Sequence, residues 1–169
     1  MNEYKFSGKA LKFNLGNSDR EYLLGGLRYG NFRKFVVAEL FDASTGEGEQ
    51  RAIIPSHVRA LKKAMLDNTY APTIFTIGTR KKHRESLEYE KDNVSLTVKE
   101  SNPLPLLDAN NRAASLEMIR SESKALETLV DNLYIPYILY LNGDPRADFL
   151  VLQAGKPVSR DHTLSVRIA

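Results

Sequence analysis

The sequence contains no cysteine, and no uncharged stretch in it approaches the length of a membrane-spanning helix. The absence of cysteine excludes disulfides, a thiolate nucleophile and a thiolate metal site, and it fits a reducing compartment. A membrane helix needs about 20 consecutive apolar residues. Residues 1–20 are too polar for a secretory signal. We therefore expect a cytoplasmic protein that has no membrane partner.

Several common signatures of enzymes and cofactor sites are also missing. There is no Walker A sequence, no G-x-G-x-x-G dinucleotide motif and no G-x-S-x-G nucleophile elbow. Rossmann-type and serine-hydrolase functions therefore have no support. The histidines are His57, His83 and His162, and their spacing does not match the H-x-x-x-H or H-E-x-x-H metal motifs. We expect no metal site built from histidine.

The length of 169 residues fits one domain, because a chain of this size can bury a hydrophobic core without disulfides. We expect a single domain over residues 1–169, without internal repeats or low-complexity linkers. Residues 1–30 leave two alternatives open, an edge strand and a partly ordered arm. The net charge of +3 and the pI of about 9.0 are compatible with nucleic-acid binding.

The first half of the chain is predicted to contain a strand, a helix and two further extended segments. Phe32–Phe41 is rich in Phe and Val and precedes a polar stretch with glycine, which indicates a strand and a turn. Pro55 is typical of a first helical turn, and the apolar residues that follow it at helical spacing are Val58, Leu61 and Met65. Thr73–Ile77 is expected to be extended. Alternating apolar residues indicate a later strand with Val94, Leu96 and Val98.

The second half alternates more regularly between strands and helices. Leu106 and Leu107 lead into a turn, and we expect a helix to begin near Asn111. A second helix is predicted over Lys124–Asn132, and Ile135–Leu141 has the β-branched and aromatic composition of a strand. Pro145 can open a last helix, which Gly155 and Pro157 would close. This alternation predicts an α/β fold with a mixed sheet and flanking helices.

The strongest candidate site is the strand-to-helix turn from Asp108 to Arg112. Free backbone N–H groups at a helix start favour anions, and an arginine nearby adds charge and bidentate geometry for phosphate. Asp108 is the candidate catalytic residue, since it could orient a ribose hydroxyl, hold Mg²⁺ or activate water. The structural alternative is a helix N-cap formed by Asp or Asn, with Arg112 in a surface ion pair.

Two further groups of residues could contribute to binding. Gln153 and Lys156 could reach the same phosphate or base from a second side, although a lysine after a helix end also suits a C-cap. The basic run holds Arg80, Lys81, Lys82, His83 and Arg84. Such a cluster suits a nucleic-acid backbone, although a solvated loop is the simpler alternative.

In order, these pieces resemble the ParB/sulfiredoxin-like superfamily, in its DGQHR branch. The similar segments, within residues 50–165, are PSHVRALKKAMLDNTYAPTI, LLDANNRAASL and IPYILYLNGDPRADFLVLQAGKPVS. Asp108 and Arg112 match the Asp and Arg of the family signature. Ala109, Asn110 and Asn111 stand where the family has Gly, Gln and His. The missing His removes a proton carrier, so we expect binding rather than catalysis.

The resemblance implies a ParB-like domain of a bacterium or phage that works with DNA. Relatives include chromosome-partition proteins, proteins associated with DNA phosphorothioate modification and restriction, and nucleotide-hydrolysing defence proteins. It implies that Asp108, Asn110, Asn111, Arg112, Gln153 and Lys156 hold a nucleotide, as an NTP with Mg²⁺, or a nucleic-acid phosphate. An NTPase or nuclease-associated activity stays open, and so do a homo-oligomer and DNA-processing partners.

The alternative function is a non-catalytic DNA-binding regulator, or an assembly module for other proteins, with a vestigial pocket. In that case DNA would contact the basic run 80–84. The sequence ends inside a stretch that is expected to be structured, Thr163 to Ile168. This pattern leaves open a longer protein with a DNA-binding or nuclease part beyond Ala169.

Overall fold

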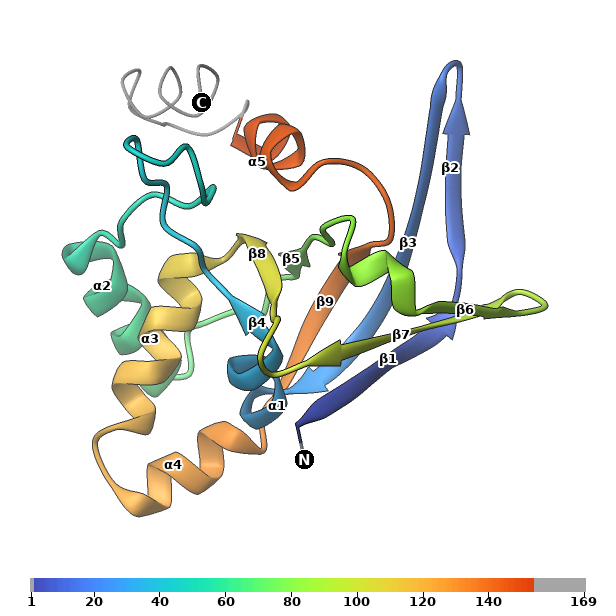
Figure 1. Ribbon diagram of the computed structural model, residues 1–169. Helices are drawn as coiled ribbons and strands as arrows, with labels where there is room; N and C mark the ends of the chain where they lie inside the picture. Colours follow the sequence, from blue (N-terminus) through green and yellow to red (C-terminus); the bar gives the residue numbers. More distant parts are fainter. Residues whose placement is uncertain (1, 154–169) are drawn as a thin grey trace.

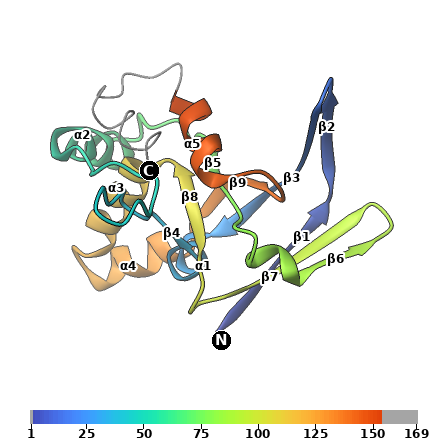
Figure 2. The same ribbon diagram turned by 45° about the horizontal axis from the view of Figure 1, so that its top comes forward.

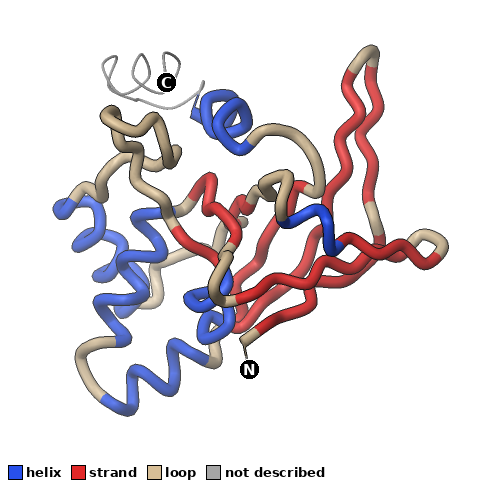
Figure 3. Tube along the Cα trace, viewed as in Figure 1, coloured by secondary structure: helices blue, strands red, loops and turns tan. Residues whose placement is uncertain are grey.

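Two β-sheets organise the structure, a computed structural model that describes residues 2–153 (Figures 1 and 3). The strands are β1 (Glu3–Lys9), β2 (Leu11–Leu15), β3 (Ser18–Arg28), β4 (Val36–Val37), β5 (Phe75–Ile77), β6 (Leu87–Glu90), β7 (Asn93–Lys99), β8 (Leu104–Asp108) and β9 (Tyr134–Tyr140). The helices are α1 (Tyr29–Phe35), α2 (Pro55–Leu66), α3 (Asn110–Arg120), α4 (Lys124–Asp131) and α5 (Pro145–Gln153), with a 3-10 turn, η1, at His83–Ser86. The fold is therefore α/β with a mixed sheet, as the sequence predicts.

The larger sheet has the strand order β2-β3-β9-β5-β8-β4, and the smaller one has the order β1-β7-β6. In the larger sheet β5 runs parallel to β9 and antiparallel to β8, while β3 runs antiparallel to β9. Helices α2, α3 and α4 lie together at one side of this sheet, and α5 lies near the strand-to-helix turn after β8 (Figures 1 and 2). Residues 1–30 contain strands β1, β2 and β3, of which β1 and β2 lie at the edges of their sheets.

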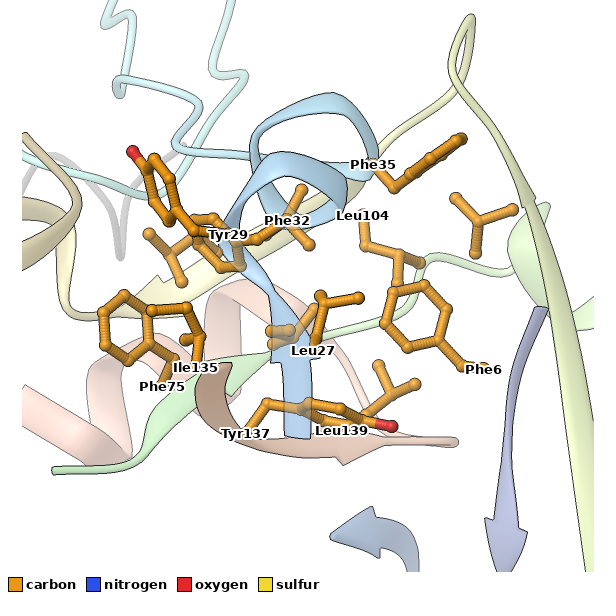
Figure 4. Packing of buried hydrophobic residues seen from close by; sticks show 14 of the residues in the cluster. Phe6, Leu27, Tyr29, Phe32, Phe35, Phe75, Leu104, Ile135, Tyr137 and Leu139 are labelled. Carbon is orange, nitrogen blue, oxygen red and sulfur yellow. The ribbon is translucent and has the colours of Figure 1, made fainter. Parts of the chain in front are cut away.

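The core lies between the two sheets and α1. Alternation in β7 buries Val94, Leu96 and Val98 on one face, as the sequence indicates. From the larger sheet, Leu27, Tyr137 and Leu139 pack against the same cluster, and α1 contributes Tyr29, Phe32 and Phe35 (Figure 4). Burial of this aromatic and aliphatic surface is the main stabilising contribution to the fold.

The predicted strand over Phe32–Phe41 is wrong. Residues 29–35 form helix α1, and only Val36 and Val37 pair as a strand, next to β8. The helix is favoured because Tyr29, Phe32 and Phe35 recur at spacings of three, which places all three rings on one helical face toward the core. The helices predicted from Pro55, near Asn111, over Lys124–Asn132 and from Pro145 are confirmed.

Candidate functional site

The candidate site begins where β8 ends at Asp108 and α3 begins at Asn110. Between them, Ala109 makes the turn with φ of 91° and ψ of 22°, which is the left-handed region. A side chain at positive φ is strained, and glycine is the usual residue there. The turn thus has a conformation that favours glycine, although an alanine stands here.

Asn110 and Asn111 hold the segment before α2 against the start of α3. The side-chain Oδ1 of Asn111 accepts a hydrogen bond from the Ile54 N–H at 3.0 Å, and the Asn110 amide Nδ2 donates to the Arg51 carbonyl at 3.2 Å. Ser115, one turn later, donates its hydroxyl to the carbonyl of Val58 in α2. These contacts give both asparagines a structural role at the site, and they leave the N-cap position of α3 to Ala109.

The Arg112 side chain is also engaged within the protein. Its Nη1 donates to the carbonyl oxygens of Thr73 and Ile74 at 3.0 and 3.1 Å. Its Nη2 lies 3.5 Å from Asp108 Oδ2, and its guanidinium lies over the Phe75 ring at 4.8 Å. Arg112 therefore anchors the segment that leads into β5, and its positive charge stays beside Asp108.

A cleft of about 300 Å³ opens at this turn. It is lined by Gln50, Arg51, Ala52, His57, Leu61, Asp108, Ala109, Asn110, Asn111, Arg112 and Gln153. The structure thus brings five predicted residues together, four from the turn and Gln153 from α5. Lys156, the sixth, lies outside the described residues, as do Gly155, Pro157 and the stretch 163–168.

Two helix starts meet at the cleft, and neither is capped by a side chain. The first turn of α2 contributes His57 to the lining, and the first turn of α3 contributes Asn110 to Arg112. The N-terminal N–H groups of a helix carry a partial positive charge, so both helices favour an anion here. Arg51 adds a further positive charge, and among residues 2–153 the lining holds one carboxylate, that of Asp108.

Sequence reasoning missed Gln50, Arg51 and His57 as members of this cleft. Gln50 is buried and donates its amide to the Leu106 carbonyl at 2.7 Å, which ties the loop before α2 to β8. Of the three, only His57 carried a signal in the sequence, since it lies in the first turn of a recognisable helix. The other two are placed by contacts between segments more than 50 residues apart.

The basic run does not form part of the cleft, and its members differ in their surroundings. The Nη1 of Arg80 forms an ion pair with the buried Glu49 at 2.9 Å. The Nη2 of Arg80 donates a hydrogen bond to the carboxylate of Glu39 at 2.5 Å. Burial opposes the charge of Arg80, but its pKa is raised because these two carboxylates outweigh that effect. Arg84 donates to the carbonyls of Thr79 and Gly143.

Lys81 and Lys82 are exposed. A surface that binds phosphates must present its cations to solvent. Of the basic run, only these two residues are exposed in this way.

Neither a cluster of metal ligands nor a membrane helix is present in the described part of the chain. Within residues 2–153, no group of three or more His, Cys, Asp and Glu side chains is arranged to hold a metal ion. No helix in the same range is both long and apolar enough to cross a membrane.

The fold and the site together define an α/β protein with a cleft at a strand-to-helix turn, where charged and amide side chains take part in the lining. Comparisons with models of protein families, with curated proteins and with solved structures give no match. The similarity to the ParB/sulfiredoxin-like superfamily therefore stays a prediction from the motifs. The cleft itself is the basis on which a function can be proposed.

Proposed function

We propose that the cleft binds a phosphate group, either of a nucleotide or of a nucleic acid, and that the chain is a DNA-associated binding domain. The observation that supports this proposal is the meeting of two helix starts without side-chain caps at one cleft that also holds Arg51 and His57. Helix starts bind phosphate through backbone N–H groups, and an arginine adds charge-assisted hydrogen bonds. A cationic ligand would be disfavoured by the two arginines and the helix starts at this lining.

The lining residues suggest a division of roles. Backbone N–H groups at the start of α3 and the side chains of Arg51 and His57 would contact phosphate. Gln153 offers an amide for a base or a ribose, because its Oε1 is buried without a hydrogen-bond partner among the residues that the structure describes. Arg112 would position the turn and supply charge, since its donors already bond to backbone.

Asp108 suits either a ribose hydroxyl or a Mg²⁺ ion that is held mainly by the phosphates. Mg²⁺ in nucleotide sites is commonly bound by one or two carboxylates together with phosphate oxygens, rather than by a cage of protein ligands. A single carboxylate in the lining fits that arrangement. A bound ion would neutralise phosphate charge, and Asp108 would fix its place in the cleft.

A second candidate function is DNA binding through Lys81 and Lys82, with the cleft vestigial. The supporting observation is that these two adjacent lysines are exposed on the loop between β5 and η1, while Arg80 and Arg84 hold that loop in place. Phosphate backbones are bound by such solvent-facing cations without sequence preference. This function leaves open a homo-oligomer or a complex with DNA-processing proteins.

A thermal-shift screen of ATP, GTP, CTP and UTP, each with and without Mg²⁺, tests the cleft. A ligand that binds only the folded state at a hundredfold excess over Kd should raise the Tm by about 5 to 10 °C. We expect His57→Ala and Arg51→Ala to reduce the shift. Asp108→Asn should reduce only the part that depends on Mg²⁺ if Asp108 binds the ion, and should reduce the shift without Mg²⁺ as well if it binds the ribose.

Lys82→Ala is the matched control, because it removes an exposed cation outside the cleft and should leave the shift unchanged. Arg112→Ala should lower the Tm without ligand as well, since it removes the hydrogen bonds to Thr73 and Ile74. No shift with any nucleotide, or a shift that all cleft variants retain, would remove the nucleotide proposal and favour the second function.

A further inference from the structure

Strand β2 is an edge strand of the larger sheet. It pairs with β3 on one side and with no other strand of residues 2–153 on the other. The hairpin of β2 and β3 projects from the body of the molecule, and its end near the turn stands clear of the other elements, while the β6–β7 hairpin lies near the base of β2 (Figures 1 and 2). An edge of this kind offers backbone N–H and C=O groups to another chain.

One face of β2 is apolar and largely exposed. Leu11, Phe13 and Leu15 share one face of β2, since side chains alternate along a strand. Phe13 is 53% exposed and Leu15 is 71% exposed, and Val151 of α5, on the same side of the sheet, is 73% exposed. Monomeric proteins rarely leave such a group of apolar side chains beside an unpaired edge.

The other long edges of the two sheets are protected by charge, and β2 is not. Strand β1 carries Glu3, Lys5 and Lys9, and β6 carries Glu88 and Glu90. Charged side chains on edge strands prevent pairing with other chains. The five residues of β2, LKFNL, contain a single charge, on Lys12.

The turn of the hairpin determines which backbone groups of β2 point outward. Leu15 pairs with Ser18 across a two-residue turn in which Gly16 has φ of 62°. The two residues that flank such a turn exchange backbone hydrogen bonds with each other. Along the strand, the backbone groups of successive residues then point alternately toward the partner strand and away from it. Leu11, Phe13 and Leu15 therefore direct their backbone groups toward β3. Those of Lys12 and Asn14 face outward.

We propose that this edge is the interface between two copies of the chain, which pair antiparallel through β2 about a two-fold axis at Phe13. In this register Lys12 and Asn14 of one copy exchange backbone hydrogen bonds with Asn14 and Lys12 of the other. Phe13 then lies opposite Phe13 as a closely spaced pair without hydrogen bonds.

The pairing is self-complementary in its side chains as well. Across the two-fold axis, Leu11 of one copy faces Leu15 of the other, and the two Phe13 rings face each other. Each Lys12 faces Asn14 of the other copy, so no like charges oppose each other. If the two-fold axis passed through Lys12 instead, Lys12 would lie opposite Lys12 of the second copy. Leu15 would then have no partner within β2 of that copy. The paired edge is five residues long, so the interface is small and the association should depend on concentration.

A cysteine scan tests the register, because the chain has no cysteine of its own and any disulfide must join two copies. Residues 11–15 are replaced by cysteine one at a time, oxidised mildly and examined on non-reducing gels. Only the position on the two-fold axis faces itself, so Phe13→Cys should form dimers at least about tenfold faster than Lys12→Cys or Asn14→Cys, given the short Cβ–Cβ reach of a disulfide. Mixed Lys12→Cys and Asn14→Cys chains should cross-link to each other.

Sedimentation velocity over a concentration series provides a second measurement that leaves Phe13 in place. Asn14→Glu places a carboxylate opposite Lys12 of the second copy and should lower the dimer Kd, whereas Asn14→Lys should raise it. Asn93→Lys makes the same change at an exposed strand position of the smaller sheet and should have no effect. Unchanged Tm values would show that the variants are folded.

Three outcomes would overturn the proposal. The chain could stay monomeric at every concentration, cross-linking could be equal across residues 11–15 or fastest at a residue other than 13, or the two Asn14 variants could sediment alike. A monomer that binds nucleic acid or another protein through Phe13 and Leu15 would assign the same face to a different partner. That result too would exclude pairing of two copies.

Discussion

Ala109 is the residue at which local strain and the candidate site coincide. Its φ of 91° lies in the left-handed region, and its methyl group is buried at the turn between β8 and α3. For a residue with a side chain this conformation costs about 1–2 kcal/mol. The turn tolerates that cost because Asn110, Asn111 and Arg112 tie it to neighbouring segments.

Replacing this alanine by glycine should stabilise the protein. We expect Ala109→Gly to raise the free energy of unfolding by about 0.5–1 kcal/mol, since relief of strain exceeds the added entropy of the unfolded glycine. Urea denaturation measures the change. Ala114→Gly, in the interior of α3, is the control and should lower the same free energy by about 1 kcal/mol. Equal losses in both variants would show that the turn at Ala109 is unstrained.

His83 is a buried residue whose protonation should affect folding. Its Nδ1 accepts a hydrogen bond from the Arg80 N–H at 3.0 Å, and its Nε2 lies 3.0 Å from the carbonyl oxygen of Asn102. Burial lowers the pKa of His83 below its ordinary value of 6.5. The neutral ring satisfies both contacts, whereas a proton on Nδ1 would remove the first of them.

Stability should therefore fall as the pH drops below about 6.5. In that range the unfolded state binds a proton that the folded state does not, so the free energy of unfolding decreases until the folded-state pKa is reached. Each unit of difference in pKa corresponds to about 1.4 kcal/mol. His83→Gln, which cannot be protonated, should show a flatter dependence between about pH 5 and 7.5 in urea denaturation. Parallel curves for the two proteins would contradict a role for this ring.

At the scale of elements, the spacing of apolar residues predicts the helices of the second half of the chain correctly. The prediction is wrong where the same apolar residues fit either a strand or a helix. Phe32–Phe41 is apolar enough for a strand, and only the spacing of Tyr29, Phe32 and Phe35 favours the observed helix. Strand β3 was missed because Gly25 and Gly26 interrupt it. A Cβ at Gly25 would lie 2.6 Å from the Tyr137 hydroxyl, so the neighbouring strand explains the glycine.

At the scale of the whole molecule, the sequence located half of the candidate cleft. The residues from Asp108 to Arg112 are contiguous, so the turn could be recognised from the pattern alone. The other side depends on the loop before α2, which is held by Gln50 against β8 and by a hydrogen bond from Arg146 of α5 to the Gly46 carbonyl. Contacts between such distant segments leave no periodic signal in a single sequence.

The salt dependence of DNA binding tests whether DNA contacts the exposed lysines Lys81 and Lys82. If Lys81 and Lys82 each neutralise a phosphate of duplex DNA, the slope of log K against log salt should flatten by about 0.9 for each lysine that is replaced by alanine. Fluorescence anisotropy from about 50 to about 300 mM salt measures that slope. Lys5→Ala with Lys9→Ala removes the same charge from exposed positions of β1 and should leave the slope unchanged. Equal flattening in both double variants would mean that DNA responds only to net charge, and binding through the loop between β5 and η1 would be excluded.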